Sequence, residues 1–243
     1  GYEFTKYGGS NNAENSGTLK YVSIRHTGTA VSPGNELQGL TMGGVGSGTV
    51  IENIELIGSE DDGIEIFGGA VNVTNIVIAN FDDDGIDLDQ AYDGTISNAV
   101  VIMAPGSDTV FEIDGTEEPN NAIVGEYTIK NVTAYGRSDA AKFDTFGNWK
   151  SDATGFNENV LFVDFPASTT LGGIDSDTYD GAGTAPIEGK LNFKDFIVVT
   201  SDSKATVVGG QVDEASATWI SVSTTRPSSK GADESVFGWT QFF

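Results

Sequence analysis

Residues 49–58 read Thr-Val-Ile-Glu-Asn-Ile-Glu-Leu-Ile-Gly, and this stretch decides the fold because its outline returns along the chain. It recurs as Asn-Val-Thr-Asn-Ile-Val-Ile in 72–78, as Thr-Ile-Ser-Asn-Ala-Val-Val in 95–101 and as Thr-Ile-Lys-Asn-Val-Thr-Ala in 128–134. The shared Asn residues lie 22, 23 and 33 positions apart, so the later repeats contain insertions. A period of this size indicates a repeat architecture in which each repeat is one structural unit.

The repeated outline predicts strands and a tight bend. Its β-branched residues and its alternation with a period of two are typical of strands, and no segment has helical periodicity. Asn tolerates the left-handed conformation of a bend, and stacked Asn amides can hydrogen-bond to one another. We therefore expect an all-β fold, a single-stranded right-handed parallel β-helix (a solenoid) with rungs of about 22 residues and inserted loops. We expect the parallel β-helix to span residues 1–200 and a last rung or capping segment to span 201–243.

The third strand of each expected rung has an inward and an outward set of side chains, because side chains alternate across a strand. The inward set is apolar: Ile64 and Ile66, Ile86 and Leu88, Phe111 and Ile113, and Ala141 and Phe143. The outward residues form two files, which read Thr41, Glu65, Asp87, Glu112 and Lys142, and Gly43, Phe67, Asp89, Asp114 and Asp144. The sequence thus predicts an acidic strip on one face of the solenoid.

A strip of stacked carboxylates favours a bound cation. Two charges about 5 Å apart repel by about 3 kcal/mol at an effective dielectric constant of 20. The chain has no cysteine and one histidine, so an oxygen-rich site favours calcium over transition metals. The first candidate ligands are Asp87, Asp89, Glu112, Asp114 and Asp144, and a second set in one loop is Asp175, Asp177 and Asp180. A solvated acidic surface or turn without metal is the alternative for both.

The composition excludes several classes of partner. The chain has 243 residues with 36 Asp+Glu against 12 Lys+Arg, a formal charge of −24. Nucleic acids and anionic membranes need basic patches, so neither is an expected partner. Disulfides and thiolate zinc sites are excluded, and no apolar run is long enough to span a bilayer. The first residues lack the layout of a signal peptide, so we expect a mature, processed or fragment chain.

The outward side of the strand that follows each Asn bend is apolar, as at Val77, Val100 and Leu161. An exposed apolar file of this kind indicates a face that another segment covers. The expected cover is either the loop 166–188 or the tail 201–243, whose aromatic residues could also cap the last rung.

Five segments of the sequence form a recognisable set: Asn-Ser-Gly-Thr-Leu-Lys-Tyr-Val-Ser-Ile-Arg-His-Thr-Gly (15–28), Leu-Thr-Met-Gly-Gly-Val-Gly-Ser-Gly-Thr (40–49), Asp-Asp-Gly-Ile-Glu-Ile-Phe-Gly-Gly (61–69), Asp-Asp-Gly-Ile-Asp-Leu-Asp-Gln-Ala-Tyr (83–92) and Val-Phe-Gly-Trp-Thr (236–240). Together they resemble a group of secreted or surface-exposed β-helix proteins of Bacteroidota and other marine Gram-negative bacteria. Members carry a further N-terminal capping segment, which is not seen here, so the resemblance implies an open first rung.

This resemblance implies a non-catalytic scaffold, adhesion or glycan-binding component. Its expected location is extracellular or on the outer-membrane surface of a Gram-negative bacterium. The expected partners are carbohydrate or other protein chains at the cell surface, including a further copy of the chain that stacks on the open first rung. Calcium is the expected stabilising ion.

A polysaccharide-active enzyme is the alternative, because the chain is also distantly similar to the pectate lyase and polygalacturonase superfamily. By similarity to the polygalacturonase pattern, Asp83 or Asp84 would be the general acid, and Asp62 with its neighbour would activate water. The Gly-His-Gly and Arg-Ile-Lys elements of that family have no counterpart here. By similarity to pectate lyases, Lys142 or Arg137 would be the base beside a calcium ion, although the acids around Lys142 would hold its proton.

Overall fold

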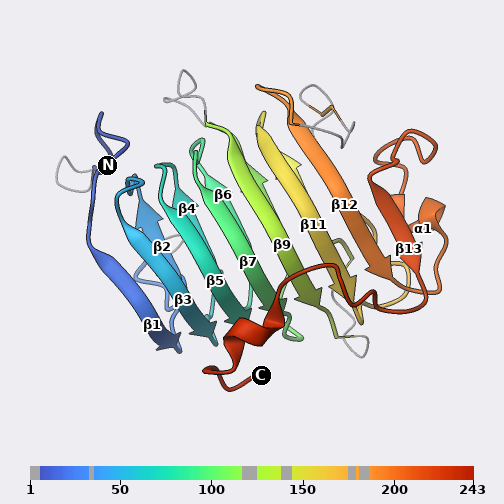
Figure 1. Ribbon diagram of the computed structural model, residues 1–243, viewed down its shortest axis with the longest axis horizontal. Coiled ribbons are helices and arrows are strands. Elements are labelled where there is room, and N and C mark those ends of the chain that lie inside the picture. The colour runs from blue at the N-terminus through green and yellow to red at the C-terminus, as the bar shows by residue number, and fades with distance from the viewer. Residues whose placement is uncertain (1–5, 33–35, 117–124, 138–143, 175–178, 181–185) are drawn as a thin grey trace.

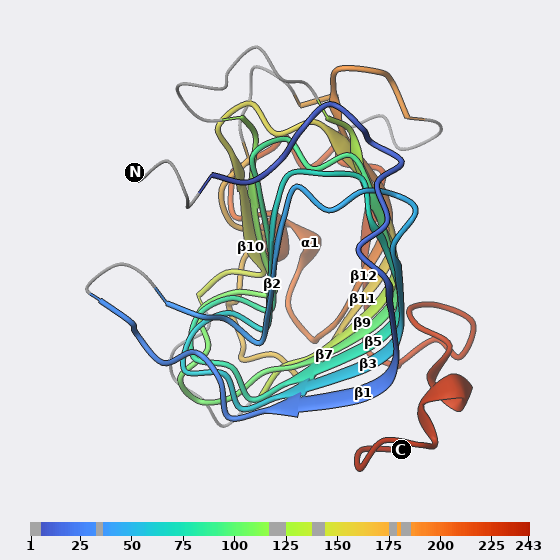
Figure 2. The same ribbon diagram turned by 90° about the vertical axis from the view of Figure 1, so that its left-hand side faces the viewer.

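The computed structural model is a right-handed parallel β-helix, as the repeat predicts. It describes residues 6–32, 36–116, 125–137, 144–174, 179–180 and 186–243. Two parallel sheets, one of eight and one of five strands, face each other across the core (Figures 1 and 2). Among the described residues, no helix is long and apolar enough to cross a membrane.

The eight-stranded sheet carries the repeated Asn outline. Its strands, in spatial order, are β1 (Thr18–Arg25), β3 (Val50–Ile57), β5 (Asn72–Ala79), β7 (Thr95–Ile102), β9 (Tyr127–Tyr135), β11 (Gly155–Val163), β12 (Leu191–Val199) and β13 (Ile220–Ser223). The five-stranded sheet follows the order β10 (Gly147–Lys150), β8 (Phe111–Asp114), β6 (Ile86–Asp89), β4 (Ile64–Phe67) and β2 (Leu40–Gly43). From β1 to β11 the chain alternates between the two sheets, so each rung adds one strand to each sheet.

The repeated Asn residues form the bend that the sequence predicts. Asn53, Asn75, Asn98, Asn131 and Asn159 all have positive φ, between 56° and 60°. Tyr21 and Asp195, with φ of 55°, occupy the same place in the first and last full rungs. The amides hydrogen-bond along the solenoid axis, with Asn75 Nδ2 donating to Asn53 Oδ1 at 3.1 Å. Stacked amides therefore fix the register that aligns the rungs.

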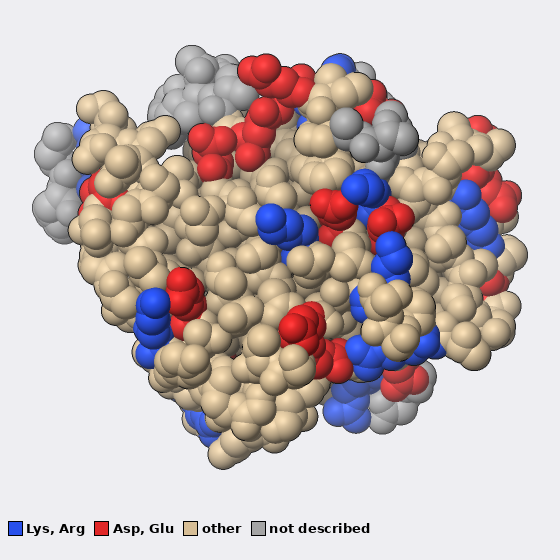
Figure 3. Space-filling model, in the orientation of Figure 1, with Lys and Arg blue, Asp and Glu red and all other residues tan. Residues whose placement is uncertain are grey.

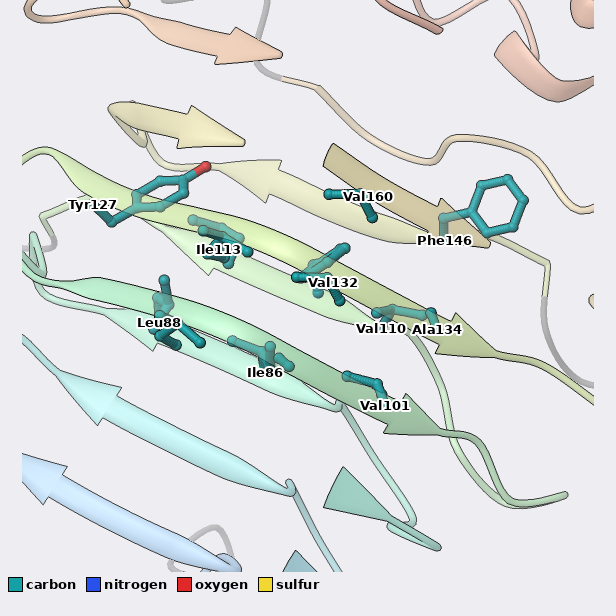
Figure 4. Packing of buried hydrophobic residues seen from close by; sticks show 14 of the residues in the cluster. Ile86, Leu88, Val101, Val110, Ile113, Tyr127, Val132, Ala134, Phe146 and Val160 are labelled. Carbon is teal, nitrogen blue, oxygen red and sulfur yellow. The ribbon is translucent and has the colours of Figure 1, made fainter. Parts of the chain in front are cut away.

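The core consists of side chains stacked in columns between the two sheets. Ile54, Ile76, Ala99, Val132 and Val160 occupy one such column, all 1% exposed or less. Figure 4 shows how residues of neighbouring rungs meet inside the solenoid. Toward the C-terminal end the column members become aromatic: Phe111, Trp149, Phe162, Phe193, Phe196 and Trp219. The short helix α1 (Lys204–Val208) adds Val207 and Val208 to that end of the core.

The predicted register of the fifth short strand is wrong. Strand β10 pairs Phe111 with Gly147, Glu112 with Asn148 and Asp114 with Lys150. The inward positions that we assigned to Ala141 and Phe143 are thus taken by Gly147 and Trp149. Residues 141–144 and 147–150 have the same alternation, but an insertion places the strand at 147–150. In this register the large indole of Trp149 is completely buried.

This shift of register changes two candidate site residues. Lys142 lies outside the described residues. Asn148 pairs with Glu112 and therefore takes the place in the outward file that was predicted for Lys142. Asp144 is exposed and precedes β10, and Lys150 occupies its predicted place beside Asp114. A basic side chain therefore ends the acidic strip where the sequence predicted another acid.

The tail covers the apolar outer face of the eight-stranded sheet. After β13 the chain runs back across β11, β9, β7 and β5, as Figure 1 shows. The 3₁₀ helix η2 (Glu234–Phe237) places Phe237, which is completely buried, against Val77 and Val100. The tail thus provides cover for this face, as one of the two predicted alternatives expects.

Candidate functional site

Five acidic side chains gather on the outer face of the five-stranded sheet. We call Asp62, Glu65, Asp84, Asp87 and Glu112 the carboxylate cluster. Glu65, Asp87 and Glu112 are neighbours in register, each at the second position of its strand, β4, β6 and β8. Asp62 and Asp84 lie two residues before β4 and β6. The 22-residue repeat thus stacks the same acidic turn and strand twice, which brings the carboxyl groups together.

Most of the cluster is buried, which is rare for acidic residues. Asp62 is 5% exposed, Glu65 7%, Asp84 3% and Asp87 7%. Burial, followed by repulsion from Asp62 and Asp89, raises the pKa of Glu65 to about 8. Burial also raises the pKa of Asp62, Asp84 and Asp87 well above the usual range. Without a cation, these groups therefore retain protons near neutral pH.

Hydrogen bonds order the two acidic turns. The Asp84 backbone N–H donates to Asp62 Oδ1 at 3.0 Å. The next rung repeats this contact, because the Thr109 backbone N–H donates to Asp84 Oδ1 at 2.8 Å. The Thr109 hydroxyl donates to the same oxygen at 2.5 Å. One oxygen of Asp62 and one of Asp84 thus belong to the scaffold that holds the turns in place.

Lys150 neutralises one end of the cluster. Its Nζ lies 2.5 Å from Glu112 Oε1 and 3.3 Å from Asp114 Oδ2. Burial acts to raise the pKa of Glu112, but hydrogen bonds from Lys150 and Asp84 lower it overall. Glu112 is therefore ionised, and the neighbouring Asp84 is the protonated partner in their hydrogen bond.

The other end of the cluster holds unsatisfied carboxyl oxygens. Glu65 Oε2 and Asp87 Oδ1 are buried and have no hydrogen-bond partner. One oxygen each of Asp62, Glu65 and Asp87 lie within 4.8 Å of one another. Buried polar atoms without a partner are rare and costly. Calcium–oxygen distances of 2.3–2.6 Å fit oxygens that lie this far apart, so these three residues could hold such an ion.

Two further groups of acids lie in the turns beside the cluster. They are Asp61 with Asp62 and Asp83, and Asp83 with Asp84 and Asp108, and each group includes at least one exposed residue. Water can satisfy exposed carboxylates, so neither group makes as strong a case for an ion as the buried set. Burial, followed by repulsion from Asp61 and Glu112, raises the pKa of Asp83.

The structure unites only some of the predicted metal ligands. Asp87 and Glu112 belong to the carboxylate cluster, whereas Asp114 bonds to Lys150 and Ser151. Asp89 ends β6, on the second outward file. In the second predicted site, Asp175 and Asp177 lie outside the described residues, and the backbone N–H of Asp180 donates to Leu191 O.

Sequence reasoning gave no metal-binding role to two contributors to the site. The pattern places Glu65 in the outward file but not among the metal ligands, and it suggests Asp62 only as a residue that activates water. The shared 22-residue spacing of Asp62 to Asp84 and Glu65 to Asp87 is the signal that pairs them. Lys150 could not be found this way, because an insertion of unknown register precedes it.

Asp84, a candidate general acid, and the neighbouring Lys150 are both engaged by other groups of the site. Asp84 is 3% exposed, and Thr109 and Glu112 both contact its carboxyl group. Lys150, the base-type residue in the cluster, is held by Glu112 and Asp114, which raise its pKa despite partial burial. A general base must be unprotonated and free to face its substrate near neutral pH, so this lysine is unsuited to that role.

The comparisons with known proteins agree with the fold. Residues 3–242 match a family model described as a pectate-lyase like beta helix domain. No curated protein and no solved structure matches the chain.

Proposed function

This chain belongs to the pectate-lyase-like β-helix family, and we propose that it is a non-catalytic, calcium-stabilised binding module that acts outside the cell. The observation that carries the proposal is the pair of unpartnered, buried oxygens on Glu65 and Asp87 beside Asp62. A calcium ion would give both oxygens the partner that they lack.

Calcium suits these three residues better than other common cations. All ligands are carboxylate oxygens, which hard cations prefer, and the chain has no cysteine for a softer metal. Magnesium needs near-ideal octahedral geometry and retains several waters, which is difficult between residues that are more than nine-tenths buried. Calcium would displace the protons that these groups hold in its absence, and three carboxylates around a divalent ion leave one net negative charge.

The non-catalytic part of the proposal is supported by the contacts of Asp84 and Lys150. Asp84 is almost completely buried, and Lys150 is bound by two carboxylates. Both residues are engaged in holding the cluster together.

An extracellular location is supported by the charge and by the site. The formal charge is −24, and extracellular calcium modules commonly have dissociation constants of about 10⁻⁴–10⁻³ M. The proposed partners are carbohydrate or other protein chains at the surface of a Gram-negative bacterium. A further copy of the chain is included, because Leu19, Val22 and Ile24 of edge strand β1 are only partly buried.

The experiment is a thermal melt of the chain with EGTA and with increasing calcium. Calcium at about 100 times its dissociation constant adds about 2.7 kcal/mol, which corresponds to a Tm increase of roughly 5–10 °C. Asp87→Asn should abolish most of this increase, because the amide is neutral and a weaker ligand. Asp164→Asn is the matched control, since Asp164 is exposed and outside the cluster. No increase in the unmodified chain, or an equal increase in both variants, would refute the calcium site.

Polysaccharide hydrolysis is the second candidate function, and one observation favours it. Asp84 and Glu112 are neighbouring carboxyl groups whose pKa values are moved in opposite directions, as in acid–base pairs. Incubation with polygalacturonate, alginate and ulvan would reveal hydrolysis as new reducing ends and elimination as absorbance at 235 nm. We expect neither, and activity that Asp84→Asn abolishes would replace the non-catalytic proposal.

A further inference from the structure

A separate cavity lies where β2, β4 and β6 end, and it is not part of the carboxylate cluster. Its volume is about 530 Å³, and its lining includes Tyr7, Asn12, Phe67, Gln90 and Asp93. This volume falls within the range of about 300–1,000 Å³ that is usual for ligand sites. We propose that this cavity, the Tyr7 pocket, binds a neutral sugar unit of a glycan.

Aromatic rings and bare backbone shape the pocket. Tyr7 and Phe67 have ring centroids 6.2 Å apart, and Tyr7 is 57% exposed. A Cβ atom at Gly43 would lie 2.9 Å from the Tyr7 ring, so the ring packs on a position without a side chain. Gly68 and Gly69 continue this open floor. An exposed ring above a shallow floor offers an apolar face for the C–H side of a sugar ring.

The pocket also has groups that can bond to hydroxyls. Asn12, Gln90 and Asp93 line it. Amides and carboxylates both accept hydrogen bonds, and amides also donate them. A few convergent polar groups in a partly apolar cavity are the usual pattern of a specific ligand site.

The backbone at Gln90 provides independent support. Gln90 and Ala91 have φ of 56° and 55°, a left-handed conformation that costs most residues about 1–2 kcal/mol. The preceding rung has Gly68 and Gly69 after its strand, both with positive φ, for which this conformation is not strained. Gln90 thus lines the pocket at a conformational cost that glycine would avoid.

The surrounding charges favour a neutral ligand. Burial, followed by the nearby Asp89 and Glu65, raises the pKa of Tyr7, so its hydroxyl stays protonated. Asp93 is a further acid in the lining, although Lys6 lines the pocket too. An anionic sugar would meet the carboxylate of Asp93, whereas a neutral one would only exchange hydrogen bonds.

The pocket lies next to the proposed calcium site. Glu65 and Phe67 point outward from the same strand and are about 7 Å apart along it. The inference rests on the proposed binding role, because it names a ligand for that role, but it does not require calcium.

The test is isothermal titration calorimetry with cellohexaose, xylohexaose, laminarihexaose and mannohexaose, each in EGTA and in calcium. Oligogalacturonate is the anionic probe. We expect at least one neutral probe to bind in EGTA, with amide chemical-shift changes at Gly44, Gly68 and Gln90. If no neutral probe binds, the inference is wrong. Binding of oligogalacturonate alone, and only with calcium, would also overturn it while supporting the calcium module.

Two variants separate binding from folding. Tyr7→Ala should weaken binding about tenfold or more, since a lost aromatic contact of about 1.4 kcal/mol corresponds to a factor of ten. Tyr21→Ala is the matched control, because Tyr21 is 65% exposed and does not line the pocket. Gln90→Gly should also reduce affinity without lowering Tm, because glycine accepts the positive φ. Unchanged affinity in both pocket variants would refute the site.

Discussion

The smallest unit that determines this structure is the single Asn at each bend. Asn75 has a φ of 58°, donates to Asn53 and accepts a 2.7 Å hydrogen bond from Asn98 Nδ2. One residue type thus meets a conformational need and a hydrogen-bonding need together. This double constraint explains why the Asn positions could be predicted from the sequence alone.

Replacing Asn75 tests this double role. Asn75→Ala should lower the free energy of unfolding by about 2–4 kcal/mol, because it adds left-handed strain to the loss of hydrogen bonds. Asn75→Gly removes the same hydrogen bonds but relieves the strain, so it should cost about 1–2 kcal/mol less. Urea unfolding measures both. Equal losses in the two variants would show that the backbone conformation contributes little.

The buried acids predict an unusual dependence on pH. The folded-state pKa of Glu65, about 8, lies above its ordinary value of 4.5, so the folded chain binds more protons between these values. Its contribution to stability is therefore complete below pH 4.5 and is lost as pH rises through 8. In EGTA we expect a loss of about 1–2 kcal/mol across this range, after allowance for solvent screening.

The double variant Glu65→Gln, Asp87→Asn is the control for this pH effect. Its amides do not titrate, so urea unfolding in EGTA should depend less on pH than in the unmodified chain. Saturating calcium should flatten the profile of the unmodified chain as well, because the ion replaces the protons. A stability that rises from about pH 5 to about pH 8 without calcium would contradict the assigned pKa directions.

At the scale of elements, spacing predicted the strands that recur at a regular interval but not the one after a long insertion. The stretches Ala141-Lys-Phe-Asp144 and Gly147-Asn-Trp-Lys150 have the same alternation, so periodicity cannot choose between them. Packing makes the choice in the structure, where Trp149 lies 5.9 Å from the ring of Phe111, centroid to centroid. The predicted neighbours Asp87 and Glu112 are therefore in register, whereas Asp144 does not occupy its predicted place beside Asp114.

Burial of the acids was also beyond the reach of the pattern. The alternation of side chains along a strand indicates that Glu65 and Asp87 point away from the core. It does not indicate which residues lie over that face. The sequence consequently predicted a solvent-facing strip or ion site, while the structure buries both residues to more than nine-tenths.

The tail is the other element whose placement can be tested. It is fastened to the Asn bends, because the Gly231 N–H donates to Asn159 Oδ1 at 3.0 Å and the Asp233 N–H donates to Asn98 Oδ1 at 2.7 Å. Gly231 has a φ of 83°, and a Cβ atom there would lie 2.3 Å from Thr133 Oγ1. Only glycine fits this contact.

Gly231→Ala should therefore destabilise the tail. We expect a loss of about 1–3 kcal/mol in urea unfolding, together with faster amide hydrogen exchange in residues 231–241. Gly210→Ala is the matched control, since Gly210 also has positive φ, 75°, but a Cβ atom there would have no neighbouring atom within 4 Å. Similar effects in the two variants would mean that close packing of the tail does not contribute.

At the scale of the whole molecule, the two sheets present different outer faces. On the eight-stranded sheet, acids and bases lie beside one another, as Figure 3 shows, and Lys230 pairs with Asp195 at 3.0 Å. The tail covers the apolar part of this face. On the five-stranded sheet, by contrast, carboxyl groups are stacked and buried together. On the outer face of the eight-stranded sheet, charges are paired and the tail covers the apolar part. On the outer face of the five-stranded sheet, we propose that a cation completes the fold.

The most direct test of the account is a crystal structure of the chain grown with calcium, compared with one grown in EGTA. We expect anomalous and difference density for one ion between Asp62, Glu65 and Asp87, with oxygen distances of about 2.3–2.6 Å. In EGTA the same site should hold no ion, with Glu65 and Asp87 protonated. Identical side-chain positions in both crystals, with no ion among these three carboxyl groups, would contradict the central claim.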